Sequence, residues 1–216
     1  MASIILSFVG TQDPYSDRTN EEGSIVTFVK HLSAQNNNIT HIFLLFTQDL
    51  QERAEITQQW LKEEAKVTAS VELIPVDPAL SEDPIDIPLA TTAAKQALTL
   101  AKEYAAIGDI FEFNSSSGTP PMKSTWIVLQ ASGYAPHSRG WQVRNPREMR
   151  AGQARVFAAN LSGLKAEFDR NIIQQQLTDY NYSGALTTIE NSGLNDELVT
   201  ALLNYSTFHQ YEIQYR

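Results

Sequence analysis

Strand-like and helix-like segments alternate along most of this chain, and that rhythm limits the folds open to it. The apolar run 3–9 is rich in β-branched and aromatic side chains and stops at Gly10. The next segment, 21–36, places its apolar side chains at helical spacing. Further strands are predicted at 39–46, 71–76 and 107–113, and further helices at 50–67, 90–105 and 119–131. The stretch 77–88, rich in proline and carboxylates, is expected to be a loop.

This alternation predicts an α/β fold, a Rossmann-like and mostly parallel sheet with right-handed crossovers and helices on both faces. After Gly133 the rhythm changes. Two more strands, 140–144 and 154–161, are expected to form an antiparallel pair with an arginine-rich connection between them. The last predicted elements are helices, at 165–177, 183–191 and 196–208. We therefore expect one domain at 1–162 and a helical extension or linker at 163–216.

Composition excludes several classes of protein. Acidic side chains outnumber basic ones by 25 to 16, for a net charge of −9, which argues against a binder of duplex nucleic acid. The chain has no cysteine, so thiol nucleophiles, disulfides and cysteine-bound metals are excluded. Its apolar runs are far shorter than the roughly 20 residues that span a bilayer. With no signal-peptide pattern at the start, we expect a cytoplasmic protein without a membrane partner.

Polar side chains gather directly after the first and the fourth predicted strand. In a doubly wound sheet, ligands bind beyond the carboxyl ends of the strands, where the strand order reverses. If the order runs 3-2-1-4, the loops after strands one and four are neighbours and form one site. The candidate ligand-binding residues are Gly10, Thr11, Gln12 and Asp13 in the first loop and Asn114, Ser115, Ser116, Ser117, Gly118, Thr119, Met122 and Lys123 in the second.

The second loop has the chemistry of an anion site. Its hydroxyl groups and glycine lead into a helix that begins with Pro120 and Pro121, which lack the N–H groups that a helix start leaves unpaired. Exposed amides at 117–119, the positive helix end and Lys123 would together favour a negative charge. The alternative is that the hydroxyls only cap a helix. The spacing fits neither a Walker loop nor a dinucleotide fingerprint.

Other candidates carry weaker signals. Asp13 and Asp17 could hold a metal, but a turn around Pro14 explains them better. The histidines are scattered without ligand spacing, so we expect no metal and no cofactor. Five arginines lie at 139, 144, 147, 150 and 155. They form either a solvated loop or a pairing surface for the acidic loop near Asp83, or else one or two of them reach a bound phosphate. Trp126 is expected in the core.

Both loops resemble the ligand-binding motifs of CARF (CRISPR-associated Rossmann fold) domains. The resemblance rests on SFVGTQDP at 7–14 and FNSSSGTPPMK at 113–123, and it covers about 1–162. The phrase DYNYSGAL at 179–186 is similar to the start of the linker that leads to a HEPN ribonuclease domain in type III CRISPR effectors. A HEPN nuclease needs Arg followed by His after four to six residues, and no histidine of this chain follows an arginine at that spacing. The sequence therefore resembles a CARF sensor with the beginning of a linker, either a natural short form or a piece of a longer effector.

The resemblance implies a homodimer that binds one ring of cyclic oligoadenylate across its twofold axis, cyclic tetra-adenylate ahead of hexa-adenylate. It also implies slow, metal-independent ring-nuclease cleavage that ends type III CRISPR signalling. In that role Lys123, Ser116 and Ser117 would stabilise charge, Thr11 would act with Gln12 to orient ribose or phosphate, and Asn114 would bind adenine or ribose. Two alternatives stay open: a sensor that binds without cleaving, and an unrelated α/β domain that binds a nucleotide or sugar phosphate.

Overall fold

One six-stranded sheet organises the chain, in the order β3-β2-β1-β4-β5-β6. The computed structural model describes residues 2–17, 20–35, 37–65, 67–192, 194, 201 and 204. Strands β1 to β5 run parallel and β6 runs antiparallel to β5. The expected order 3-2-1-4 and the expected antiparallel pair after it are both confirmed, and so is the Rossmann-like α/β class.

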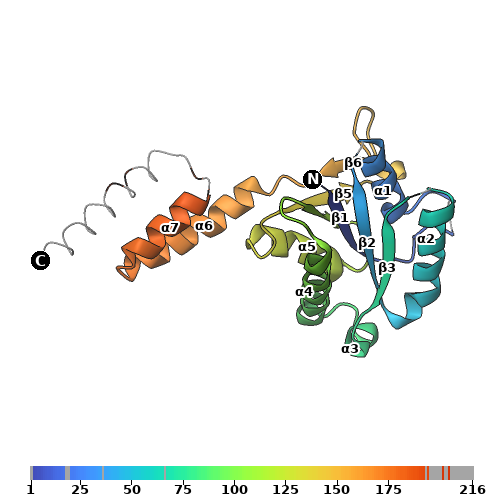
Figure 1. Ribbon diagram of the computed structural model, residues 1–216, viewed down its shortest axis with the longest axis horizontal. Helices are drawn as coiled ribbons and strands as arrows, with labels where there is room; N and C mark the ends of the chain where they lie inside the picture. The colour runs from blue at the N-terminus through green and yellow to red at the C-terminus, as the bar shows by residue number, and fades with distance from the viewer. Residues whose placement is uncertain are drawn as a thin grey trace, which may run out of the picture. The chain divides into compact units, whose positions relative to one another are not determined.

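The strands and helices follow each other as the hydrophobic pattern predicted (Figure 1). The strands are β1 (Ser3–Phe8), β2 (Ile39–Phe46), β3 (Ser70–Pro75), β4 (Ile110–Asn114), β5 (Ser138–Val143) and β6 (Val156–Ala158). The helices are α1 (Ser24–Ala34), α2 (Gln51–Glu63), α3 (Pro78–Glu82), α4 (Ile87–Tyr104), α5 (Pro120–Ala131), α6 (Ser162–Thr178) and α7 (Tyr182–Ser192), with 3₁₀ turns at Gln48–Leu50 and Pro146–Glu148.

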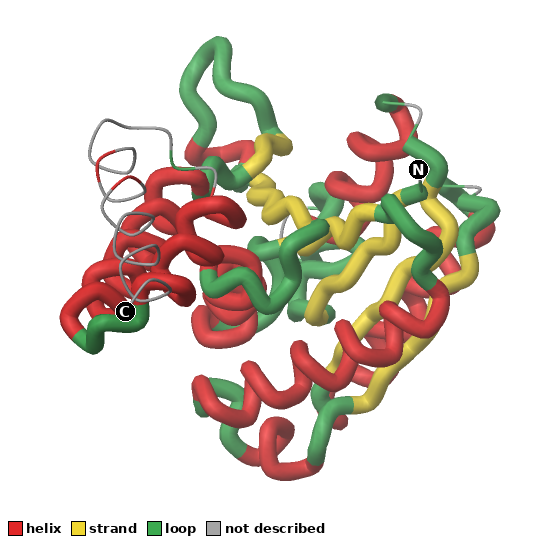
Figure 2. The backbone as a smooth tube through the Cα atoms, turned by 60° about the vertical axis from the view of Figure 1, so that its left-hand side comes forward, coloured by secondary structure: helices red, strands yellow, loops and turns green. Residues whose placement is uncertain are grey.

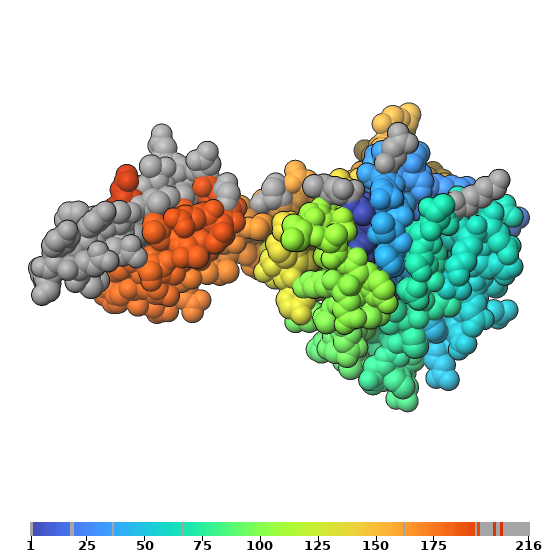
Figure 3. Space-filling view, in the orientation of Figure 1, coloured from blue at the N-terminus to red at the C-terminus, as the bar shows by residue number. Residues whose placement is uncertain are grey.

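Helices cover both faces of the sheet, because each central strand buries side chains on both sides. Ile4, Leu6 and Phe8 of β1 face α4 and α5, in a core that contains the fully buried Trp126. Ile5 faces the opposite way, toward α1 and α2. Figure 2 shows the strands enclosed between these two helical layers, and in the space-filling view of Figure 3 the side chains of α4, in green, and α2, in cyan to teal, form much of the visible surface. Trp126 is thereby confirmed as a core residue.

Two predicted segments differ from the structure. The stretch 77–88 was expected to be a loop, yet it contains α3, whose first turn is capped by the Asp77 carboxylate accepting a hydrogen bond from the Ala79 amide at 2.8 Å. Pro78 occupies the first helical turn, where its missing N–H costs nothing. The predicted strand 154–161 is only three residues long, as β6. Of the predicted helix 196–208, only residues 201 and 204 are among the described residues.

Contacts divide the chain into two compact units, Met1–Gln130 with Tyr134–Ala159, and Ala131–Gly133 with the chain from Asn160 onward. In the second unit, α6 and α7 form a helical hairpin around Ile173, Ala185 and Ile189. Asn181 caps α7 by accepting a hydrogen bond from the Gly184 amide at 3.0 Å. Among the described residues, no helix has the length and apolar character needed to cross a bilayer.

Candidate ligand-binding site

A pocket of about 510 Å³ opens at the carboxyl ends of β1 and β4, where the strand order reverses. That is the place at which doubly wound sheets bind their ligands. The lining residues come from four segments: Gly10, Thr11, Gln12, Asp13 and Ser16; Glu21, Glu22, Gly23 and Ser24; Ser116, Ser117, Gly118 and Lys123; and Val143, Arg144, Asn145, Pro146, Arg147 and Arg155. All of them belong to the first compact unit.

The two predicted loops meet directly through Asp13. Its carboxylate accepts a hydrogen bond from the Ser117 hydroxyl of the second loop, a short contact in this structure. The same carboxylate accepts the amide of Gly10 at 3.1 Å and the amide of Ile25, in α1, at 3.0 Å. Three separate segments are therefore held by one side chain. The expectation that these two loops are neighbours is confirmed, and both of them line the same pocket.

Asp13 is 1% exposed, which has an electrostatic consequence. Burial raises the pKa of its carboxyl above the ordinary 3.8, because the charged form loses hydration. The hydrogen bonds from Ser117, Ile25 and Gly10, and the nearby charge of Lys123, act in the opposite direction but do not cancel this effect. Asp13 thus organises the loops from below the surface of the pocket rather than presenting an open carboxylate.

Asp13 and Asp17 do not act together. The Asp13 amide donates to the Gly10 carbonyl at 3.1 Å, which closes a turn before Pro14, while Asp17 forms an ion pair with Arg53 of α2. Arg53 also donates to the carbonyls of Asp13 and Tyr15, at 3.4 and 3.3 Å, and so fastens the first loop to α2. Within the described part of the chain, no group of three or more acidic or histidine side chains could hold a metal ion.

Glycines form the floor of the pocket because nothing larger fits. A Cβ atom at Gly10 would lie 2.8 Å from the Ser117 Oγ and 3.0 Å from the Gly118 amide nitrogen. Gly118 has a φ of +92°, and a Cβ there would lie 3.0 Å from the Cβ of Phe8. Gly23 is packed more tightly still, since its Cβ would meet Asp13 Oδ1 at 2.4 Å. Backbone therefore approaches backbone where the two loops cross.

Most hydroxyl and amide side chains of the second loop bind protein atoms. The Asn114 side chain donates to Ser7 and Ser24, at 3.1 and 3.3 Å, and accepts the Ser116 amide. Ser115 donates to the Trp141 carbonyl at 2.7 Å, and Ser116 accepts the Val143 amide at 2.7 Å. These bonds fix the loop between β1 and β5.

Thr119 and Met122 are also turned away from the pocket. The Thr119 hydroxyl donates to the Pro84 carbonyl at 2.6 Å, which ties the start of α5 to the segment before α4. Met122 is buried in the core beside Trp126. Of the second loop's predicted residues, Asn114, Ser115, Thr119 and Met122 do not line the pocket, whereas Ser116, Ser117, Gly118 and Lys123 do.

Backbone donors and one lysine remain available in this wall. Within the described residues, the backbone N–H groups of Ser117, Gly118 and Thr119 donate no hydrogen bond to protein. They precede α5, whose dipole adds partial positive charge. Lys123, half-buried, lines the same pocket. Thr11 and Gln12, both exposed, line it from the first loop.

Arginines from the connection between β5 and β6 also line the pocket: Arg144, Arg147 and Arg155. Their pairing with the acidic loop near Asp83, one of the two expectations for this cluster, is wrong. Arg147 lies 3.9 Å from Glu21, and Arg155 donates to the Glu22 carbonyl at 2.8 Å. Sequence reasoning noted these arginines but did not include them in the site, since only the packing of β5 beside β4 brings them there.

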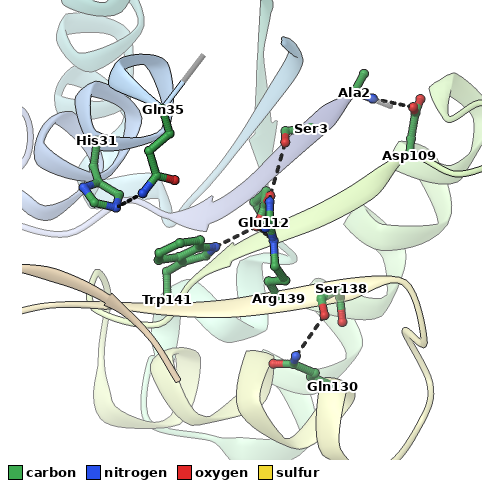
Figure 4. A network of polar contacts seen from close by, with 10 residues as sticks. All are labelled: Ala2, Ser3, His31, Gln35, Asp109, Glu112, Gln130, Ser138, Arg139 and Trp141. Carbon is green, nitrogen blue, oxygen red and sulfur yellow. Dashed lines mark hydrogen bonds and ion pairs between the residues drawn. The ribbon is translucent and has the colours of Figure 1, made fainter. Parts of the chain in front are cut away.

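Arg139, the first of the arginine cluster, belongs to a buried network outside the pocket (Figure 4). It forms an ion pair with Glu112 of β4, whose side chain is 0% exposed. The Glu112 carboxylate also accepts the Trp141 indole N–H at 2.6 Å and the Ser3 hydroxyl at 3.2 Å. The network joins β1, β4 and β5 across the sheet.

Comparison with known proteins shows which solved structure has a similar fold. No protein-family profile and no curated protein sequence match the chain. Among solved structures it is similar to Enterococcus italicus Csm6 bound to cyclic hexa-2′-fluoro-hexa-dAMP, with a TM-score of 0.75 and 18% sequence identity over 99% of this chain and 54% of the other. The chain thus has the Rossmann-like fold that the CARF resemblance implies, and it spans about half the length of Csm6.

Proposed function

We propose that this chain binds cyclic oligoadenylate in the pocket between its two loops. The observation that carries the proposal is that, among the described residues, the amides of Ser117 and Gly118 donate no hydrogen bond to protein and line the same pocket as Lys123, at the switch point of the sheet. Such an arrangement accepts phosphate without needing a basic protein surface. The likeness to Csm6, which was solved with a cyclic hexanucleotide analogue, supports this ligand class.

The ring is proposed to lie across a homodimer. A volume of about 510 Å³ is within the range of roughly 300–1,000 Å³ that holds a drug-sized molecule, so one pocket has room for part of a cyclic tetra- or hexanucleotide. A second copy related by a twofold axis would present the same loops to the other half of the ring. Binding should therefore saturate at one ring per two chains.

Slow cleavage of the ring is the finer part of the proposal. The ribose 2′-oxygen would attack the neighbouring phosphorus and the bond to the 5′-oxygen would break, leaving a 2′,3′-cyclic phosphate and a 5′-hydroxyl. The 2′-hydroxyl proton passes to water, and the leaving oxygen takes a proton from Lys123 or water. Lys123 and the amides at Ser117 and Gly118 would stabilise charge on phosphate, and Thr11 would orient the ribose. Among the described residues no histidine lines the pocket, so turnover should be slow.

Calorimetric titration with cyclic tetra- and hexa-adenylate tests binding. Both rings are used because the sequence favours the smaller one and the solved neighbour holds an analogue of the larger one. Lys123→Ala should weaken binding about tenfold or more, the scale of a hydrogen bond to a charged group. Lys62→Ala, an exposed lysine on α2, is the matched control and should bind like the wild type. If neither ring binds, the alternative of an unrelated phosphate-binding domain replaces the proposal.

Chromatography of ring incubated for hours with excess protein tests cleavage. The expected product is a linear oligoadenylate ending in a 2′,3′-cyclic phosphate, formed equally in the presence of EDTA. Tight binding with intact ring would instead assign the chain to the sensors that bind without cleaving.

A further inference from the structure

We infer that Arg144 and Arg147, on the connection between β5 and β6, bind a second phosphate of the same ligand, in the same pocket as Lys123 and the amides of Ser117 and Gly118. This inference rests on the proposed function and adds to it a separate anion-binding wall. None of the loop motifs that indicate the ligand contains these residues.

The Arg144 guanidinium is held in a fixed orientation. Its carbon lies 3.7 Å from the centre of the Phe157 ring, and one nitrogen donates to the Ala154 carbonyl at 2.6 Å. A guanidinium stacked on an aromatic ring keeps its donor edge in one plane, which suits bidentate binding of phosphate oxygens. The ladder of β5 and β6 supports this arrangement, since the Arg144 amide donates to the Arg155 carbonyl at 2.8 Å.

Arg155 holds the wall in place. One of its terminal nitrogens donates to the Glu22 carbonyl at 2.8 Å, which joins the end of the arginine connection to the segment before α1. Its Nε is buried, and among the described residues it has no hydrogen-bond partner. A buried donor without an acceptor is costly, so this atom is poised for an acceptor in the pocket that it lines.

Arg147 lies at the mouth of the pocket and is free to change partners. Its side chain is 64% exposed, and its Nε lies 3.9 Å from Glu21, too far for a hydrogen bond. An exposed ion pair of this kind contributes little free energy. A phosphodiester group, whose two non-bridging oxygens share a full negative charge, would compete effectively for the same guanidinium.

The charge of the pocket differs from that of the protein. Four cationic side chains, Lys123 and three arginines, line it with three acidic ones, while the chain carries a net charge of −9. Asp13 is 1% exposed, and its carboxylate already accepts hydrogen bonds from three protein groups. Cations from α5 and from the connection between β5 and β6 thus line one cavity, an arrangement that fits successive phosphates of an oligonucleotide rather than a single anion.

The test measures the salt dependence of cyclic tetra- and hexa-adenylate binding by Arg144→Gln, Arg147→Gln and the control Arg150→Gln. Arg150 carries the same charge in the same connection but does not line the pocket. Each pocket variant should bind about tenfold more weakly, and the slope of log K against log salt should flatten by about 0.7, the value for one lost contact to a single-stranded phosphate. Arg150→Gln should change neither.

Arg144→Lys keeps the positive charge and loses the planar fork, so it should retain the slope and still weaken binding. Arg144→Lys also provides a second test of this position if Arg144→Gln disturbs the packing on Phe157. Thermal unfolding of each variant shows whether it is folded. If the wild type binds a ring and the Arg144 and Arg147 variants match Arg150→Gln, the arginine assignment is overturned while the proposed function stands. If the wild type binds neither ring, the proposed function is overturned and this inference with it.

Discussion

Replacing Asp13 with asparagine should expose the energetic role of the residue that joins the two loops. The carboxylate accepts two backbone amides and one hydroxyl. In the variant, the side-chain NH₂ takes the place of one of the two carboxylate oxygens. In either place this donor group faces a backbone N–H, that of Gly10 or that of Ile25, which it cannot accept. The Ser117 hydroxyl can turn to accept, but one buried N–H loses its acceptor, at a cost of about 1–3 kcal/mol.

This cost should depend on pH in a specific direction. The pKa of Asp13 is higher in the folded protein than the ordinary 3.8 of the unfolded chain. Between these two pKa values, the carboxyl of the folded protein is still protonated, whereas that of the unfolded chain is ionised. Wild-type stability should therefore fall as pH rises through that range, by at most about 1.4 kcal/mol per pH unit. The variant does not titrate at this position, so its deficit should be largest near pH 4 and shrink toward pH 7.

Urea unfolding followed by tryptophan fluorescence at pH 4, 5, 6 and 7 measures both effects. Asp17→Asn, which alters an exposed carboxylate in the same loop, is the control and should show no pH-dependent difference of this sign. A deficit of Asp13→Asn that grows from pH 4 to pH 7 would refute the reasoning. Such a result would mean that the hydrogen bonds and Lys123 outweigh desolvation and favour the ionised carboxylate.

Three further substitutions test the surrounding structure. Arg139→Gln leaves its buried carboxylate partner unpaired and should cost about 2–3 kcal/mol in urea unfolding, below the 3–5 for a fully buried pair because the arginine is 43% exposed. Gly118→Ala should lower the free energy of unfolding by about 1–2 kcal/mol because of its positive φ, with a further loss from crowding, and should weaken ring binding in calorimetry. Gly108→Ala, at the same φ of +92° but with open space around it, should lose only the part that comes from φ. Trp141→Phe should lower the free energy of unfolding by about 1.5–3 kcal/mol more than Trp126→Phe, because only Trp141 donates its indole N–H to a buried carboxylate.

The fold could be predicted because its signal is local and repeated. Each strand from β1 to β4 is a short apolar run, and each is followed by a helix with a periodic apolar face, so the chain order alone limits the sheet to few arrangements. The short helix α3 was missed because its prolines indicate a loop, although Asp77 before Pro78 is a helix-start signal.

The site could be predicted only in part, since a sequence shows which residues are polar but not which bonds they make inside the fold. The loops after β1 and β4 were found, and they meet through Asp13 and Ser117. Asn114, Ser115 and Thr119 were expected at the ligand, yet they bind neighbouring strands and loops. The place of the arginines in the pocket depends on the pairing of β5 with β4, which no local pattern specifies.

The glycine floor of the pocket has a consequence for how such a site can change over generations. Where Gly10 and Gly118 cross, the ligand would meet peptide groups, and those are the same whatever side chains the chain carries. Point mutations there can only destroy the surface. The walls, by contrast, are made of exchangeable side chains such as Lys123 and Arg147. Variation is thus confined to the rim, where ring size and lifetime could be retuned by single substitutions while the capacity to hold phosphate is inherited intact.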